Sequence, residues 1–235
     1  MGKNAVMSIE AAEPRWPKLL SLAVHEFRTP ITVVAGYIRM VLRERAGPIS
    51  DQQRKLLEEA EKSCGRLSAL VTEMSDLSAL EGGTAAFNSA TVDLGAVLTE
   101  AVDSVPALPD REVGLTVDGG APASLSGDAT RLRSALAALL VALRREVVSS
   151  DRLIVRRLSG EFDGRAASRL AIGEPETIDA IAAADPASLD RFDEWRGGSG
   201  LSLAIARRVI ERHGGKLYAP PGGTNAGAVV VLPRL

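Results

Sequence analysis

The first organised part of the chain, from about residue 13 to residue 45, carries apolar residues at alternating spacings of four and three. This heptad spacing is typical of an amphipathic helix that packs against other helices. The apolar positions are Leu20, Val24, Phe27, Ile31, Val34, Ile38 and Val41. The residues Ala46-Gly47-Pro48 predict the end of this helix. Ser50 followed by Gln53 predicts a capping box that begins a second helix.

The second predicted helix repeats this spacing and has a wider apolar side. One row consists of Leu56, Ala60, Ser63, Leu67, Leu70, Met74 and Leu77. A second row beside it consists of Leu57, Cys64 and Val71. Two helices with a short connection predict an antiparallel hairpin, but a hairpin alone cannot bury stripes of this width. We therefore expect a second copy of the chain to complete a four-helix bundle. The alternative is that the stripes pack on the rest of the same chain.

After Gly82-Gly83-Thr84, which ends the hairpin, the pattern changes, and residues 85–91 are expected to form a linker. Helices are expected at 92–105, 128–148 and 201–213. Strands are expected at 112–117, 152–158, 165–172, 216–219 and 226–232, with irregular or short-helical structure at 174–196. Helices and strands interleave without regular βαβ spacing. This predicts an α/β two-layer sandwich, and the α+β class for the whole chain.

Composition and charge exclude several classes of protein. The 235 residues are 46% hydrophobic and 25% charged, as in an ordinary soluble protein with one large or two modest domains. A net charge of −2 predicts no nucleic-acid partner and no anionic-membrane partner. The single cysteine, Cys64, excludes an internal disulfide and fits a reducing compartment. No apolar run has membrane-spanning length and no signal peptide is visible, so a cytoplasmic protein is expected. Residues 1–13 are expected to be a leader or a tag remnant.

The candidate chemistry lies in the hexapeptide His25-Glu26-Phe27-Arg28-Thr29-Pro30, within the first predicted helix. An imidazole nitrogen can attack a phosphoryl group, and an adjacent carboxylate can orient the ring and take its proton. His25 falls one position away from Val24 of the apolar seam, so it is expected to be accessible. Pro30 removes a backbone donor and is expected to kink the helix. On spacing alone, the simpler interpretation of an ordinary surface histidine is favoured.

The hexapeptide, the hairpin end Leu77-Ser78-Ala79-Leu80-Glu81-Gly82-Gly83 and the linker into an α/β domain together resemble the sensor histidine kinases of two-component systems. The resemblance covers about residues 15–235. It implies a dimerisation and histidine phosphoacceptor (DHp) hairpin at 14–83, followed at 92–235 by an ATP-binding domain of the Bergerat (GHKL) type. It also implies a homodimer whose partner is the receiver domain of a response regulator.

The resemblance implies a role for each polar residue of the hexapeptide. His25 would be the phosphoacceptor, and Glu26 would be its general base and orienting group. Thr29 would position the water that hydrolyses phospho-aspartate on the regulator. Arg28 and Pro30 would support the site, and the kink at Pro30 would let the bundle bend between states.

The nucleotide-binding positions match this family unevenly. Gly198, Gly200 and Leu201 resemble the second glycine box, a lid that holds phosphates at a helix N-terminus. Arg145 keeps the basic character of a phosphate-contacting position. The positions at which this chain departs from the family are Ala142 for the magnesium-binding asparagine, Gly173 for the adenine-binding aspartate, and Pro175 and Thr177 for two glycines. Further departures are Ala138, at a second position that is often asparagine, and Glu146, where an aromatic residue is usual. Glu174 or Glu176 could substitute for the aspartate, although neither has the expected register.

Losing the aspartate and the asparagine together would cost about 3–6 kcal/mol, or roughly 10²–10⁴ in nucleotide affinity. The nucleotide site is therefore expected to be vestigial, with Mg-ATP as a cofactor only if it still binds. His213 is expected to be a helix-end residue, and with two histidines and no cysteine cluster we expect no other metal site. A dinucleotide fold around the glycine run is disfavoured because no buried strand precedes it.

Three hypotheses follow from the sequence. In the first, the protein is a degenerate member of the family that exchanges phosphate between His25 and a regulator, or removes it with the help of Thr29. In the second, it is an ATP-dependent autokinase with an atypical nucleotide site. In the third, it is a pseudokinase that acts only as a dimeric docking module, a role for which a complete hexapeptide would not be needed.

Overall fold

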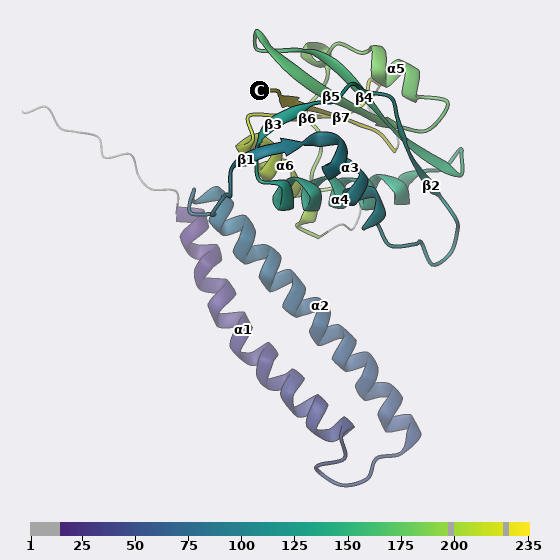
Figure 1. Ribbon diagram of the computed structural model, residues 1–235. Helices are drawn as coiled ribbons and strands as arrows, with labels where there is room; N and C mark the ends of the chain where they lie inside the picture. Colours follow the sequence, from purple (N-terminus) through teal and green to yellow (C-terminus); the bar gives the residue numbers. More distant parts are fainter. Residues whose placement is uncertain (1–14, 197–199, 223–225) are drawn as a thin grey trace, which may run out of the picture. The chain divides into compact units, whose positions relative to one another are not determined.

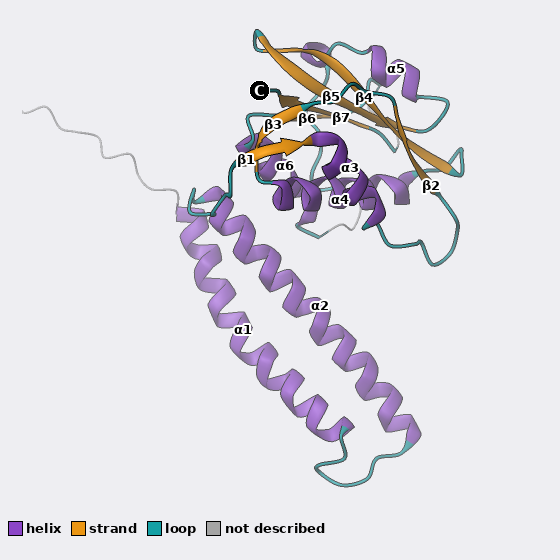
Figure 2. Ribbon diagram, in the orientation of Figure 1, coloured by secondary structure: helices purple, strands orange, loops and turns teal. Residues whose placement is uncertain are grey.

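The computed structural model describes residues 15–196, 200–222 and 226–235, so the expected leader at 1–13 lies outside the described residues. The chain divides into two compact units, Met1–Ala85 and Ala86–Leu235. The described part of the first unit is a helical hairpin, and the second combines helices with a sheet (Figures 1 and 2). The predicted α+β class, with two helices followed by an α/β unit, is confirmed.

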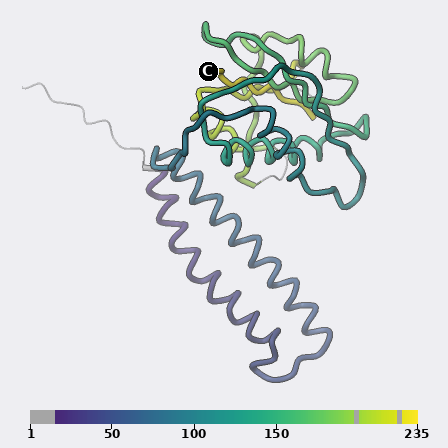
Figure 3. Tube along the Cα trace, viewed as in Figure 1, coloured from purple at the N-terminus to yellow at the C-terminus, as the bar shows by residue number. Residues whose placement is uncertain are grey.

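The hairpin consists of α1 (Arg15–Leu42) and α2 (Asp51–Glu81), which run side by side in opposite directions (Figure 3). The predicted capping box begins α2: Gln53 N–H donates to Ser50 Oγ at 3.2 Å, and Ser50 N–H donates to Gln53 Oε1 at 2.8 Å. At the other end, the buried Ser78 hydroxyl donates to the Pro17 carbonyl at 2.8 Å. This bond ties the start of α1 to the end of α2.

The apolar seam of α1 and the two apolar rows of α2 are only partly buried within the hairpin. On α1, Val24 is only 2% exposed, whereas the seam residues Phe27 and Val34 are 52% and 49% exposed. On α2, Cys64 and Val71 of the second row are buried, whereas the first row is exposed at Leu56, Leu67 and Leu70. The hairpin therefore buries Val24 of the α1 seam with Cys64 and Val71 of the second α2 row, and leaves much of the remaining apolar surface of both helices exposed.

The second unit is built on a five-stranded sheet of order β2-β4-β5-β7-β6. The strands are β2 (Gly114–Asp118), β4 (Arg152–Phe162), β5 (Arg165–Gly173), β6 (Lys216–Tyr218) and β7 (Ala228–Pro233). The β2–β4 pair is parallel, and the other pairs are antiparallel. A separate antiparallel pair joins β1 (Ala90–Asp93) to β3 (Ser124–Gly127).

Alternate residues of the central strands belong to two apolar cores. Leu170 and Val230 join the larger core with three helices, α3 (Leu94–Asp103), α4 (Ala129–Glu146) and α6 (Ser202–Arg212). Ala171 and Val229 join a smaller core that includes Ile178 and Ile181 of α5 (Ile178–Ala183). Because neighbouring side chains of a strand point to opposite faces, α5 covers the face opposite to the three longer helices. A 3₁₀ turn, η1 (Pro186–Ser188), follows α5.

Two short strands depart from the expected elements. The predicted helix 92–105 is wrong at its start, because β1 occupies Ala90–Asp93 and Asp93 then caps α3 by accepting from Gly95 N–H at 2.7 Å. Strand β3 was not expected. Both strands have four residues and are held by pairing with each other, which a local pattern does not reveal. Within the described residues, no helix is both long enough and apolar enough to cross a membrane.

Candidate functional site

The hexapeptide lies in the middle of α1, and all its polar side chains are exposed. Val24 packs inside the hairpin, and His25, one position further round the helix, faces solvent as predicted. His25 and Thr29 are separated by four residues and therefore lie on one face of the helix, with Glu26 beside them. The arrangement presents an imidazole, a carboxylate and a hydroxyl on one accessible surface.

Helix α1 continues through Pro30 as a single α-helix. Because proline has no backbone N–H, the carbonyl of Glu26 lacks its usual helical donor. One turn further on, Thr32 Oγ1 donates to the carbonyl of Arg28 at 2.8 Å. The helix beside His25 therefore has one fewer backbone hydrogen bond than a regular helix, which is where a bend would be easiest.

On α4, the position that the resemblance assigns to a magnesium-binding asparagine lies in the apolar core. Ala142 is 3% exposed and packs in the larger core. Ala138 is partly buried, and Arg145 is exposed near the C-terminal end of the same helix. An apolar methyl group at 142 offers no oxygen to a metal ion.

The position that the resemblance assigns to an adenine-binding aspartate has close neighbouring side chains. A Cβ atom at Gly173 would lie 2.6 Å from Ile181 Cδ1 and 3.0 Å from Thr177 Oγ1. Contacts this short require the neighbours to move, so an aspartate at 173 does not fit the chain as folded. Thr177 and Pro175 are exposed in the turn that leads to α5.

The carboxylate of Glu174, the nearest candidate substitute for that aspartate, is bound by a loop of its own chain. Glu174 is 1% exposed, and its Oε1 accepts from the N–H groups of Val148 (3.3 Å), Ser149 (2.9 Å) and Ser150 (3.1 Å) and from both serine hydroxyls. Burial alone would raise the pKa of Glu174, but the hydrogen bonds from the 148–150 loop hold it below its ordinary value. Glu176, the other candidate, is exposed.

Glu146, which replaces the usual aromatic residue, forms an ion pair within this region. Its Oε1 lies 3.5 Å from Arg196 Nε, and Arg196 also donates to the Gly227 carbonyl at 3.2 Å. The Arg196 guanidinium stacks 4.1 Å from the ring centre of the buried Phe192. Burial raises the pKa of Glu146, partly offset by Arg196, and burial lowers the pKa of Arg196. Arg196 thus links the end of α4 to the residue that precedes β7.

The glycine run is described only in part. Gly198 lies outside the described residues. Gly200 is exposed with a left-handed φ of 60°, which suits glycine, and Leu201 occupies the N-cap position of α6. The retained glycine therefore lies directly before the start of a helix, where backbone N–H groups can face an anion.

His213 caps the C-terminal end of α6, as the sequence predicts, and also joins two other segments. Its Nδ1–H donates to the Val209 carbonyl at 2.7 Å, and its Nε2 accepts from Asp128 N–H at 2.9 Å. Its ring meets Phe87 edge-on at 5.5 Å, and Asp128 accepts from Asn88 N–H at 2.9 Å. Burial lowers the pKa of His213. The histidine is therefore held neutral, and its neighbours anchor the expected linker on the second unit.

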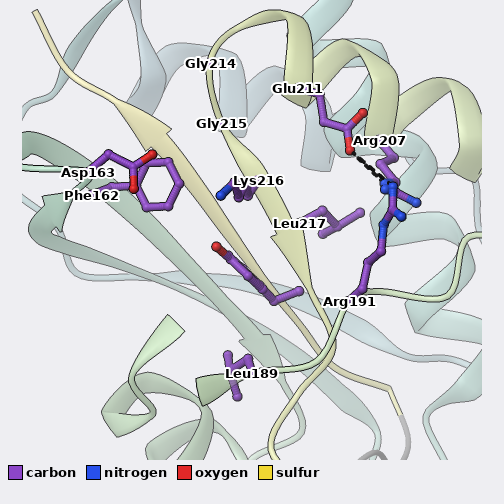
Figure 4. A pocket seen from close by; sticks show the side chains of 11 residues that line it. Phe162, Asp163, Leu189, Arg191, Arg207, Glu211, Gly214, Gly215, Lys216 and Leu217 are labelled. Carbon is purple, nitrogen blue, oxygen red and sulfur yellow. Dashed lines mark hydrogen bonds and ion pairs between the residues drawn. The ribbon is translucent and has the colours of Figure 1, made fainter. Parts of the chain in front are cut away.

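A separate hollow of about 640 Å³ lies beside β6 (Figure 4). Its charged residues have both signs, and several are paired within the protein: Arg207 donates to Glu211 Oε1 at 2.9 Å and bonds to the buried Glu194. Lys216 Nζ lies 5.0 Å from the centre of the Phe162 ring. These internal pairings leave no clear preference for a ligand of either charge.

Comparison with known proteins finds similarity to histidine kinases. Residues 18–83 match the His Kinase A (phospho-acceptor) domain. The circadian input-output histidine kinase CikA of Synechococcus elongatus is 27% identical over 225 residues, which cover 91% of this chain and 29% of CikA. The sensor-like histidine kinase SenX3 of Mycobacterium tuberculosis is 29% identical over 227 residues, which cover 90% of this chain and 52% of SenX3. Residues 18–83 therefore match a histidine kinase phosphoacceptor domain, and the chain as a whole is similar to sensor histidine kinases.

A solved structure has the same fold over both units. The structure of full-length ShkA in complex with AMPPNP aligns with a TM-score of 0.63 at 23% identity and covers 93% of this chain and 46% of ShkA. This chain spans about a quarter to about half of the length of the curated relatives it matches.

Sequence reasoning missed the internal partners of this family site. The hydrogen bonds of Glu174 to the 148–150 loop and the pair of Glu146 with Arg196 both join residues far apart in the chain. The only signal for them in the sequence was the presence of carboxylates where the family has other residues.

Proposed function

We propose that this protein exchanges phosphate between His25 and an aspartate on the receiver domain of a response regulator, and makes little or no use of ATP. The observation that carries the proposal is the exposed His25, with Glu26 and Thr29 beside it, inside the segment that matches the phosphoacceptor domain. The family and the exposure support the role of the imidazole, and the altered nucleotide positions support the loss of ATP use.

The transfer needs only groups that the two proteins supply. A nitrogen of neutral His25 attacks the phosphorus of the aspartyl phosphate, so that a P–N bond forms as the P–O bond to the aspartate breaks. The aspartate leaves as a carboxylate. Glu26 holds the ring through its other nitrogen and stabilises the positive charge that develops on it. In the hydrolytic variant of the reaction, water attacks the same phosphorus and the Thr29 hydroxyl orients that water.

Impaired nucleotide binding is supported by three features of the second unit. Ala142 presents a methyl group in the core, a side chain at 173 would clash with Ile181, and the Oε1 atom of Glu174 is bound by five donors of the chain itself. The exposed Arg145 and the start of α6 could still meet a phosphate. These two phosphate-binding features, Arg145 and the start of α6, favour the alternative of an ATP-dependent autokinase with an atypical site.

A homodimer is supported by the exposed apolar row of the hairpin. Apolar side chains that are 40–70% exposed occur on both helices at Trp16, Leu19, Leu22, Phe27, Val33, Val34, Tyr37, Met40, Leu56, Leu67 and Leu70. A second hairpin would bury them in a four-helix bundle, which is the usual way to cover two such stripes. The bundle surface around His25 would then receive the receiver domain.

The experiment uses receiver domains charged with labelled acetyl phosphate. We expect at least one receiver to lose its label faster in the presence of the protein. The label should then appear either as an acid-labile phosphate on the wild-type protein or as free phosphate in solution. His25→Ala should abolish the transfer, and Thr29→Ala should slow only the release of free phosphate. If every receiver in a broad panel keeps its label equally long with and without the protein, the proposal is wrong.

The alternatives are separated by two further measurements. Calorimetric titration with ATP and ADP, with and without Mg²⁺, should give no saturation below about millimolar concentrations. Label on His25 from Mg-ATP that disappears in Glu26→Gln would establish the autokinase instead. A docking module would be indicated if His25→Ala left the signalling output of cells unchanged.

A further inference from the structure

A loop wraps around the last turn of α4 and leaves two hollows beside it. Residues 104–113, between α3 and β2, form this loop. The smaller hollow has a volume of about 380 Å³ and the larger about 710 Å³. Residues 107–111 and Arg144 line both, so the two hollows are neighbours that share one wall.

Arg144 is a buried cation at this shared wall. It is 7% exposed, and its guanidinium donates to the carbonyl of Pro106. Its Nε–H is buried and has no hydrogen-bond partner among the described residues. Nor does any carboxylate of the described residues lie within 4.0 Å of the guanidinium. A guanidinium has five N–H donors, and an arginine buried to this degree is normally paired with an anion.

The ordinary explanation for a basic residue at this place is the helix dipole, which favours cations near a helix C-terminus. Here another arginine already lies at the C-terminus of α4. Arg111 donates to the carbonyls of Arg145 at 2.6 Å and Val147 at 2.5 Å. Arg111 thus bonds carbonyls at the C-terminal end of α4, whereas the Arg144 side chain bonds to Pro106 outside the helix, where a neutral donor would serve equally well.

The lining of the smaller hollow has a positive excess, whereas the charges that line the larger hollow balance. Arg111, Arg144 and Arg145 line the smaller hollow, against the single carboxylate of Asp110, and Glu112 joins the lining of the larger one. Burial, with a smaller contribution from Arg145, lowers the pKa of Arg144 below its ordinary value, and an arginine remains charged at neutral pH. An anion that enters the hollow therefore meets an unpaired and partly desolvated cation.

The larger hollow adds an apolar wall to this cation. Val102, Val105, Leu108 and Leu115 line it and are only partly buried against the core. The hollow is large enough for a small organic molecule. Its lining combines one planar, forked donor with aliphatic side chains, which suits a ligand that has an anionic head and an apolar body.

We propose that Arg144 binds the carboxylate or phosphate group of a small organic anion whose apolar body lies against Val105 and Leu108 in the larger hollow. The site is distinct from the family's nucleotide site. Arg144 follows Ala142 by two residues and so projects about 200° further round α4. The site does not depend on phosphotransfer at His25, and the nucleotide that the family binds is not its ligand.

The test is calorimetric titration of the whole chain at constant ionic strength with four probes. Hexanoate carries a carboxylate on an apolar body, and phenyl phosphate carries a phosphate on one. Acetate and inorganic phosphate carry the same head groups without a large apolar body. We expect saturable binding of hexanoate or phenyl phosphate, and the stronger of the two identifies the head group. Arg144→Met should weaken that binding about tenfold or more, because a charge-assisted bond is lost. Arg133→Met, the same change on α4 outside both hollows, should bind like the wild type.

The reverse results overturn the proposal. It is wrong if no probe saturates, if Arg144→Met binds like the wild type, or if acetate and inorganic phosphate bind as tightly as the larger probes. Amide resonances of ¹⁵N-labelled wild type give a readout that needs no variant. The stronger probe should shift residues 105–115 and leave the hairpin unchanged, and shifts confined to other residues would contradict the site.

Without a ligand, the same substitution has an expected effect on stability. If the role of Arg144 is to bind an anionic ligand, Arg144→Met should raise the melting temperature of the ligand-free protein. The substitution then replaces an unpaired buried charge with an apolar side chain of similar length. If Arg144 serves only the Pro106 carbonyl or the helix end, the melting temperature should fall, and the proposal is then wrong.

Discussion

Glu174 provides a direct test of whether its carboxylate stabilises the fold or serves nucleotide binding. Replacing it with glutamine removes the negative charge and leaves three N–H groups and two hydroxyls around a neutral amide. Hydrogen bonds to a charged group contribute about 1.5–3 kcal/mol each, but donors that share one oxygen are not additive. We expect Glu174→Gln to lower the free energy of unfolding of the second unit by about 3 kcal/mol.

The assay is urea unfolding followed by the fluorescence of Trp195, in a Trp16→Phe background so that the signal comes from the second unit alone. The matched control is Glu176→Gln, two residues further on, where the side chain is exposed. That change should alter the free energy of unfolding by no more than about 0.5 kcal/mol. A difference between the two glutamates isolates the contribution of the buried carboxylate from the general effect of removing a charge.

The pH dependence of this effect has a definite sign. The pKa of Glu174 in the folded protein lies below its ordinary value of 4.5, so its contribution is complete above pH 4.5 and is lost as the pH falls through the folded pKa. The stability gap between wild type and Glu174→Gln should therefore be constant near neutral pH and shrink in acid. If Glu174→Gln costs less than about 1 kcal/mol at pH 7 but removes measurable ATP binding, the carboxylate serves the nucleotide and our reasoning is refuted.

Three further changes test other parts of the structure. Gly173→Asp should lower the melting temperature without creating ATP binding, because the new side chain meets Ile181; a gain in affinity on titration would contradict this. The pKa of His213 is lowered from 6.5, so stability should be complete above pH 6.5 and decrease as the pH falls toward the folded value. His213→Gln should reduce that slope in urea unfolding below pH 6.5, and an unchanged slope would exclude this histidine as its source. Leu67→Glu should halve the mass measured by light scattering if the exposed row forms the dimer, whereas Val148→Glu, at an exposed apolar position of the second unit, should leave the mass unchanged.

Local signals in the sequence were sufficient for the hairpin. The heptad spacing, the stop signal and the capping box of Ser50 and Gln53 act within a few residues of each other, and the structure has the two helices and the capping box, although α1 ends at Leu42, before the predicted stop at Ala46-Gly47-Pro48. The accessibility of His25 followed in the same way, because its angle from Val24 is fixed by the helix repeat. The choice of which apolar row faces the other helix was not available from the spacing, since both rows have the same period.

The short strands and the smaller core required the tertiary structure. Strands β1 and β3 are stabilised by each other, and their paired residues are more than thirty positions apart. Helix α5 covers the second face of the sheet because Ile178 and Ile181 find apolar partners on β5 and β7. The intrinsic preference of such short segments is weak, so contacts distant in sequence decide their structure.

By itself, the sequence determined the α+β class, the hairpin, and the hexapeptide with its exposed histidine, because each of these depends on residues within a few turns of one another. Only the tertiary structure decided how the remaining charges are used. It placed the carboxylate of Glu174 on a loop 24–26 residues before it, paired Glu146 with Arg196, and buried Arg144 under the 104–113 loop without an anionic partner among the described residues. The physical reason is that the free energy of a charge depends on its burial and on the groups that surround it, and both are set by contacts between distant segments.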